Sequence, residues 1–190
     1  KAPHWDEARI AHGYRNGEDW GTILARIQEP GAPYWALRGN GGLHTTLADM
    51  VRWDAALRTD AVLTAASRES YFRPRVAEDP EGRSHYAFGW AIEKAPHGTL
   101  VQHNGGNGIY VAELLRFVDE GVMIFLASTV ADMKATPAVP NLTAIVFGEP
   151  YDLPRDERAA FCEDMSLAGA ALERAFGAVK MNFELLGNAV

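Results

Sequence analysis

The stretch from Thr99 to Ser128, TLVQHNGGNGIYVAELLRFVDEGVMIFLAS, decides the fold of this 190-residue chain. It holds two apolar segments of strand length, 109–117 and 122–128, separated by the turn-like sequence Val-Asp-Glu-Gly at 118–121. A glycine between two such segments is typical of a hairpin turn. The sequence therefore predicts an antiparallel hairpin, and the short β-rich segment 99–103 is expected to be a neighbouring strand.

The run His103–Gly108, with the sequence HNGGNG, lies between these expected strands. It does not resemble a phosphate-binding loop, because such loops place their glycines at a helix N-terminus and usually add Lys followed by Ser or Thr. Two interpretations stay open. In one, the glycines let a ligand approach the edge of a strand, whose N–H groups can face a developing oxyanion. In the other, the run is a glycine-rich hairpin that carries an incidental histidine.

Composition and charge limit the classes of partner. With 47% hydrophobic residues the chain can bury a sizeable core, as one domain or as one domain with an appendage. The net charge of −7, without a basic run, argues against nucleic acid or an anionic membrane surface, and leaves a small molecule, a peptide or a protein. The longest apolar stretch, 122–127, is too short to span a bilayer. Cys162 is the only cysteine, so an internal disulfide is excluded.

Periodicity along the chain predicts an α+β fold, an antiparallel β-sheet flanked by helices. The first helix begins at a capping box, Thr46 followed by Asp49, and Pro74 stops the second. Alternating bulky and small residues predict a strand at 86–93, whereas residues 1–42 are interpreted as ordered loop and 73–84 as turn-like. Helices are expected over 46–58, 65–72 and 139–147.

The chain divides into residues 1–150 and a tail at 151–190. The tail sequence predicts an amphipathic helix followed by a strand that has no later strand to pair with. The apolar face of that strand is formed by Val179, Met181, Phe183 and Leu185. An uncovered apolar strand favours aggregation, so another element must cover it. We interpret the tail as a truncated accessory domain or as a segment for self-association.

Several short segments match the motifs of one superfamily in order. Ala8–Tyr14 is similar to its Ala-x-Gly-Tyr segment, and Gly41–Asp49 is similar to its Gly-Gly-Leu-x-Ser-Thr-x-x-Asp helix entry. Tyr86–Trp90 is similar to a Tyr-x-x-Gly-Trp strand, and His103–Gly105 to a third catalytic motif, His-x-Gly or Lys-Thr-Gly, with its following hairpin. From residue 8 to about 148, the chain resembles the superfamily of serine β-lactamases, penicillin-binding proteins and related esterases, especially its class C and D-alanyl-D-alanine carboxypeptidase branch. The resemblance implies the sheet side of the β-lactamase/transpeptidase-like fold and a periplasmic or secreted location.

The catalytic motifs that precede this region in the family are not matched. The family acylates a serine in Ser-x-x-Lys, and this sequence contains no Ser-x-x-Lys. Its only Tyr-x-Asn, at 14–16, overlaps the Ala-x-Gly-Tyr segment. The chain thus resembles the C-terminal half of a hydrolase that cleaves a β-lactam, a D-Ala peptide or a carboxylic ester through an acyl-enzyme. Its expected partners are the substrate and the missing N-terminal half of the same protein. The isolated chain is expected to be inactive, and the alternative is a non-catalytic binding or structural module.

The resemblance also implies roles for four residues. His103 would donate a hydrogen bond to substrate or assist proton transfer, since imidazole titrates near neutral pH. Asn104 would offer its amide to substrate, Gly105 would keep the strand open, and Gly106 would donate its N–H to the oxyanion. Glu113 invites a catalytic reading, but an outward-facing or edge position is favoured. No cofactor is implied, and the histidine spacing predicts no metal site.

Overall fold

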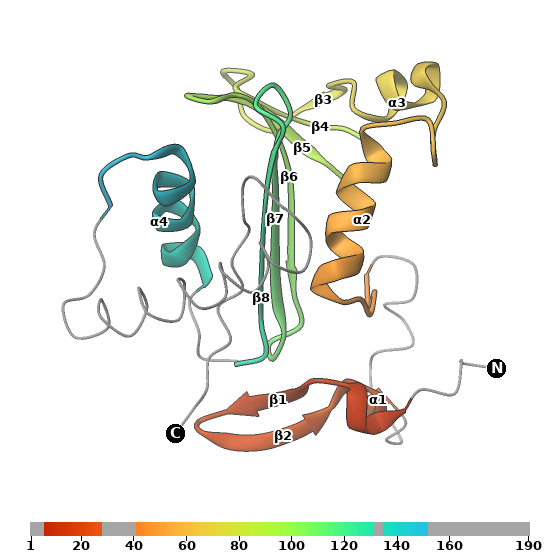
Figure 1. Ribbon diagram of the computed structural model, residues 1–190. Helices are drawn as coiled ribbons and strands as arrows, with labels where there is room; N and C mark the ends of the chain where they lie inside the picture. Colours follow the sequence, from red (N-terminus) through yellow and green to blue (C-terminus); the bar gives the residue numbers. More distant parts are fainter. Residues whose placement is uncertain (1–5, 28–40, 131–134, 152–190) are drawn as a thin grey trace.

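The computed structural model describes residues 6–27, 41–130 and 135–151, and these form an α+β fold (Figure 1). A six-stranded antiparallel sheet has its strands in chain order, β3-β4-β5-β6-β7-β8, and β1 and β2 form a separate two-stranded hairpin. The predicted fold class is confirmed. The strands are β1 His12–Arg15, β2 Glu18–Thr22, β3 Val76–Ala77, β4 Ser84–Tyr86, β5 Ala91–Ala95, β6 Gly98–Gly106, β7 Val111–Phe117 and β8 Val122–Ser128. The helices are the 3-10 helix η1 Glu7–Arg9 and the α-helices α1 Ile23–Ile27, α2 Leu47–Leu57, α3 Ala65–Tyr71 and α4 Ala135–Phe147.

The hairpin that the opening stretch predicts is β7 and β8. It turns at Gly121, whose φ of 66° suits a residue without a side chain, and β8 has the bounds expected from the sequence. Strand β7 begins two residues later than expected, at Val111. The Oδ1 of Asn107 accepts from the N–H groups of Ile109 (3.1 Å) and Tyr110 (2.9 Å), so these two residues belong to the turn before the strand.

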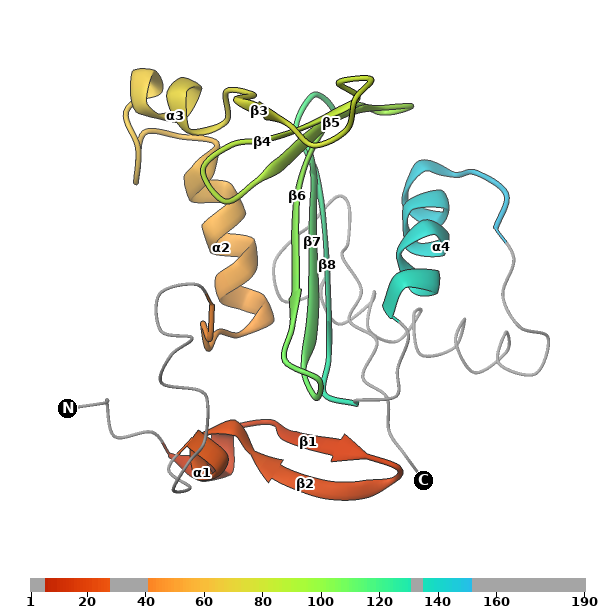
Figure 2. The same cartoon turned by 180° about the vertical axis from the view of Figure 1, so that it is seen from behind.

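Helices cover both faces of the sheet (Figures 1 and 2). On β6, Val101 packs in the core cluster below α2, whereas its neighbour Leu100 packs in the cluster that includes Leu142 of α4. The two-residue period of a strand therefore divides the apolar residues between two cores. Leu126, the residue of β8 with 0% exposure, lies on the α4 side. Burial of a side chain of this size stabilises the fold by about 1.5–3 kcal/mol.

The helix predictions are confirmed with one shift. The hydroxyl of Thr46 accepts the N–H of Asp49 at 3.1 Å, so the predicted capping box starts α2. The hydroxyl of Thr64 starts α3 in the same way, by accepting from Ser67. Helix α4 begins at Ala135, four residues before the expected start, and Pro140 lies inside it. A proline removes only one helical N–H, and the packing of α4 on the sheet outweighs that loss.

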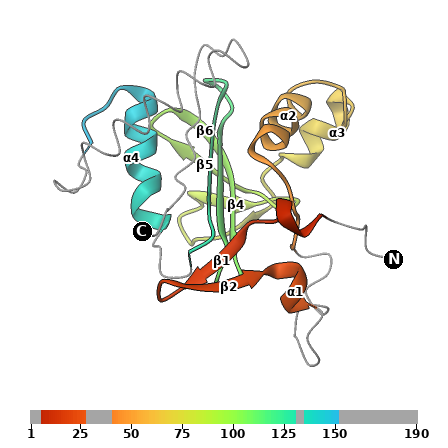
Figure 3. The same ribbon diagram turned by 60° about the horizontal axis from the view of Figure 1, so that its bottom comes forward.

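The interpretation of residues 1–42 as loop was wrong, because β1, β2 and α1 lie there. The hairpin turns at Asn16 (φ 52°) and Gly17 (φ 76°), and Asn-Gly is a strong sequence signal for such a turn. The hairpin lies across the end of the large sheet (Figure 3). The hydroxyl of Tyr110 fixes it there by donating to the carbonyls of Ala11 (2.9 Å) and Gly21 (3.2 Å).

The predicted strand at 86–93 is interrupted. Strand β4 ends at Tyr86 and β5 starts at Ala91, because Gly89 has a φ of 77° and the N–H of Ala87 donates to the carbonyl of Trp90 at 2.8 Å. The segment expected to be turn-like, 73–84, contains β3 and the start of β4. The expected helix and strand of the tail lie outside the described residues.

Candidate active site

The motif His103–Gly106 forms the second half of strand β6 and not a turn. Strand β5 begins at Ala91, which pairs with Gln102, so the pairing between β5 and β6 stops one residue before His103. Beyond that point β6 continues to pair with β7 as far as Gly106. Within the described residues, the motif therefore has a strand on one side and an open edge on the other.

The ladder bonds show which backbone groups face that edge. The N–H of Asn107 donates to the carbonyl of Tyr110, and the N–H of Val118 donates to the carbonyl of Thr99, both at 3.1 Å. In an antiparallel pair such bonds recur at every second residue, so the backbone groups of His103 and Gly105 bond to β7. Those of Asn104 and Gly106 point away from β7. The N–H of Gly106, the expected oxyanion donor, thus lies on the open edge.

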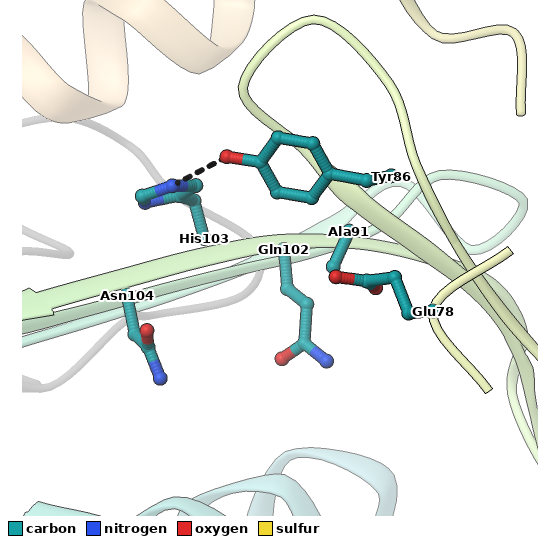
Figure 4. Close-up of a pocket in the computed structure, with 6 residues that line it drawn as sticks. All are labelled: Glu78, Tyr86, Ala91, Gln102, His103 and Asn104. Atoms are coloured by element: carbon teal, nitrogen blue, oxygen red, sulfur yellow. Dashed lines mark hydrogen bonds between the residues drawn. The ribbon is translucent and has the colours of Figure 1, made fainter. Parts of the chain in front are cut away.

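The side chains of His103 and Asn104 lie on opposite faces of the sheet. Figure 4 shows His103 on one side of β6, and Asn104 with Gln102 on the other. A pocket spans the edge between them, and its lining residues are Glu78, Tyr86, Ala91, Gln102, His103 and Asn104. The sequence placed His103 and Asn104 at one site, and the structure brings both to one pocket, but their side chains approach it from different faces.

His103 is exposed and makes a hydrogen bond through its Nε2 to the hydroxyl of Tyr86 at 3.2 Å. The sequence analysis gave Tyr86 no chemical role. It assigned the residue to a continuous strand, and no residue type near it pointed to His103. The contact depends on the end of the strand at Tyr86. The alternation of bulky and small residues continues past that point, so the sequence pattern does not reveal the break.

Gly105 leaves space on the face that carries His103. A Cβ atom built there would meet no heavy atom of the described residues within 4 Å, and its φ is not in the left-handed region. Neither packing nor backbone conformation therefore requires a glycine at this position. A Cβ on Gly106 would lie 3.4 Å from the carbonyl oxygen of Tyr110, which is an ordinary contact.

A model of the family described as Beta-lactamase matches residues 2–143. This chain belongs to the beta-lactamase family. The match includes every segment on which the sequence resemblance rests, from Ala8–Tyr14 to the β7–β8 hairpin. The chain is also 31% identical over 144 residues to penicillin-binding protein 4* of Bacillus subtilis. The aligned region covers 74% of this chain and 31% of that protein, so the chain spans about a third of the length of this curated relative. No solved structure gives a significant match.

In this member of the beta-lactamase family, Glu113 lies close to the motif but not at an edge. It is half-buried on the inner strand β7 and pairs with Asn104 on one side and Leu126 on the other. Of the two favoured positions, outward-facing or edge, its pairing on both sides excludes the edge. Burial raises the pKa of the Glu113 carboxyl, and the hydrogen bond from the Asn104 side chain opposes that rise. Asn104 therefore has a partner for its amide within the protein.

A buried ion pair fixes helix α2 against the face that carries His103. The Nε of Arg116, on β7, donates to Oδ1 of Asp54 on α2 at 2.6 Å, and Arg58 binds the other carboxylate oxygen at 2.8 Å. The sequence analysis missed this pair. The only sequence signal for the pair was the position of each charged residue, Asp54 in the predicted helix 46–58 and Arg116 in the apolar strand 109–117. Among the described residues there is no cluster of three or more metal-binding side chains, and no described helix is long and apolar enough to cross a membrane.

Proposed function

We propose that this chain forms one wall of the active site of a serine hydrolase that cleaves an amide or an ester through an acyl-enzyme. The observation that carries the proposal is the open edge of β6, where the N–H of Gly106 faces outward beside the exposed His103. Membership of the beta-lactamase family supports the reaction class. The substrate is a β-lactam, a D-Ala peptide or a carboxylic ester, and the nucleophile comes from a Ser-x-x-Lys outside this sequence.

The wall supplies hydrogen bonds to the reacting groups. The serine hydroxyl attacks the carbonyl carbon, and the carbonyl electron pair moves to an oxygen that the N–H of Gly106 faces. The tetrahedral intermediate then expels the amine or alcohol, which takes up the proton that the serine hydroxyl lost, and His103 assists that transfer or donates a hydrogen bond to the substrate. Water hydrolyses the acyl ester and restores the serine.

The test is made in the longer protein that supplies the serine. A substitution at Gly105 fills the space that the glycine leaves open. Gly105→Val places a branched side chain where no atom of the described part of the chain lies within 4 Å of the Cβ, so folding should be retained. We expect kcat/KM to fall about a hundredfold, because the side chain displaces substrate from the strand edge. Thr99→Val on the same strand is the matched control and should keep the activity. Equal activity of all three proteins would contradict the proposal.

A second candidate, a non-catalytic binding module, is favoured by the lack of Ser-x-x-Lys in this sequence. A fluorescent penicillin or a fluorophosphonate probe separates the two functions. On the proposed function, the probe labels a serine of the longer protein but none in the 190-residue chain. The binding module predicts that neither protein is labelled.

A further inference from the structure

Tyr86 is an aromatic residue whose ring lies at the open edge of β6 with its hydroxyl on His103. It is 37% exposed, so burial does not account for its place. Its backbone is held on both sides, since Tyr86 pairs with Val76 of β3 and with Ala91 of β5. Figure 4 shows the ring extending from the end of β4 toward the imidazole. The phenol is thus a fixed group beside a histidine that is itself on the sheet edge.

The chemistry of the two groups sets the direction of their hydrogen bond. A neutral imidazole has one N–H and one nitrogen with a free lone pair, while a phenol has a single O–H. The imidazole nitrogen is the better acceptor and the phenol is the better donor, so the favoured arrangement is O–H to Nε2. The group on one ring nitrogen of a histidine decides which nitrogen carries the proton. A donor on Nε2 therefore leaves the proton on Nδ1.

We propose that Tyr86 is a positioning residue of the site: it donates to Nε2 of His103, selects the tautomer with the proton on Nδ1, and leaves that N–H to bind substrate. The binding of substrate by this N–H rests on the proposed function, whereas the choice of tautomer does not. Within the described residues, the Tyr86 contact is the one hydrogen bond that the His103 ring makes. Tyr86 acts through His103 and does not itself contact the reacting atoms.

The direct test is ¹⁵N NMR of the 190-residue chain with labelled histidine, at a pH where His103 is neutral. The shifts of the two ring nitrogens report the tautomer. We expect the proton on Nδ1 in the wild-type chain, and a shift of population to the tautomer protonated on Nε2 in Tyr86→Phe. Tyr71→Phe is the matched control, since the Tyr71 ring packs on Phe72 and Trp90 and should leave the His103 signals unchanged.

Two results would overturn the inference. One is a wild-type His103 with its proton on Nε2, which needs no variant and so does not depend on whether Tyr86→Phe folds. The other is a folded Tyr86→Phe chain with the wild-type tautomer.

Activity in the longer protein provides a separate measurement. Tyr86→Phe should lower kcat/KM about tenfold, because the variant no longer holds His103 in the tautomer whose Nδ1–H binds substrate. A tautomer that responds as expected in a longer protein without hydrolase activity would contradict the proposed function and keep the Tyr86–His103 pair. If the longer protein is active and the tautomer of His103 is the same in wild type and Tyr86→Phe, only the role of Tyr86 is contradicted.

Discussion

At the scale of single residues, two glycines of the described chain have opposite reasons to lack a side chain. A Cβ on Gly13 of β1 would lie 2.3 Å from Cγ2 of Ile109, whose side chain is buried at 1% exposure. A Cβ on Gly105 would meet none of the described residues' atoms within 4 Å. Gly13 is therefore required by close packing of the hairpin on the sheet, whereas Gly105 leaves room at the site.

Gly13→Ala should destabilise the fold, because the new methyl group forces Ile109 out of its packed position. We expect a loss of about 1–3 kcal/mol in the free energy of unfolding, measured by urea denaturation. Gly105→Ala is the control for the substitution itself, and its effect should stay within about 0.5 kcal/mol. Equal effects of the two variants would show that the hairpin moves away to accommodate the methyl group.

Asp79, in the loop between β3 and β4, makes the stability of that loop depend on pH. The backbone N–H of Ser84 and then that of Arg83 hold the pKa of its carboxyl down, from 3.8 to about 2. A lowered folded-state pKa stabilises the fold above the unfolded value, and this stabilisation is lost as pH falls from 3.8 through about 2. Asp79→Asn should therefore be less stable than wild type at pH 6, and the difference should shrink toward pH 2 in denaturant titrations. A difference that is independent of pH would contradict this assignment.

Residue patterns predicted part of the site. His103, Asn104 and the two glycines form a short motif, and the family resemblance implied that they line one site, whereas the residue pattern alone left a glycine-rich hairpin open. Tyr86 is 17 residues away in the sequence, and its contact arises from the turn at Gly89. Such a contact depends on tertiary geometry, which a local pattern does not carry.

At the scale of elements, the ion pair between Asp54 and Arg116 docks α2 on the sheet. The side chain of Arg116 is 3% exposed and that of Asp54 is 10% exposed, so neither charge can turn to water. Removal of one partner of such a pair leaves a buried charge without compensation. We expect Asp54→Asn to lower the free energy of unfolding by about 3 kcal/mol in guanidinium denaturation.

The control for this prediction is an exposed ion pair on the neighbouring helix. Glu69 and Arg73 lie 3.1 Å apart with side chains 76% and 59% exposed, so Glu69→Gln should cost less than about 1 kcal/mol. If the two substitutions cost the same, α2 is held by its apolar contacts, such as that of Leu57, and the ion pair has little weight.

At the scale of the whole molecule, the sheet was predictable because its strands follow one another along the chain. A meander needs only short turns between neighbours, and local patterns report those turns well, as the β7–β8 hairpin shows. The β1–β2 hairpin was missed because its strands are short and half-exposed, and little apolar alternation remains to mark them. Its Asn-Gly turn was the signal that could have found it.

The tail at 151–190 gives the prediction for the whole chain. Within the described residues, α2 and α3 cover one face of the sheet and α4 covers the other, and each face carries a core cluster. If the tail is an accessory or self-associating segment, its deletion should leave the thermal unfolding temperature nearly unchanged. Light scattering should then show a lower mass per particle, beyond the 40 residues removed from each chain, because the apolar strand expected at 179–185 pairs between copies. An unchanged number of chains per particle together with a large loss of thermal stability would mean that the tail packs into the main core.

The same measurement on Val179→Lys, which charges the apolar face without shortening the chain, should reproduce the change in association if that face is the contact.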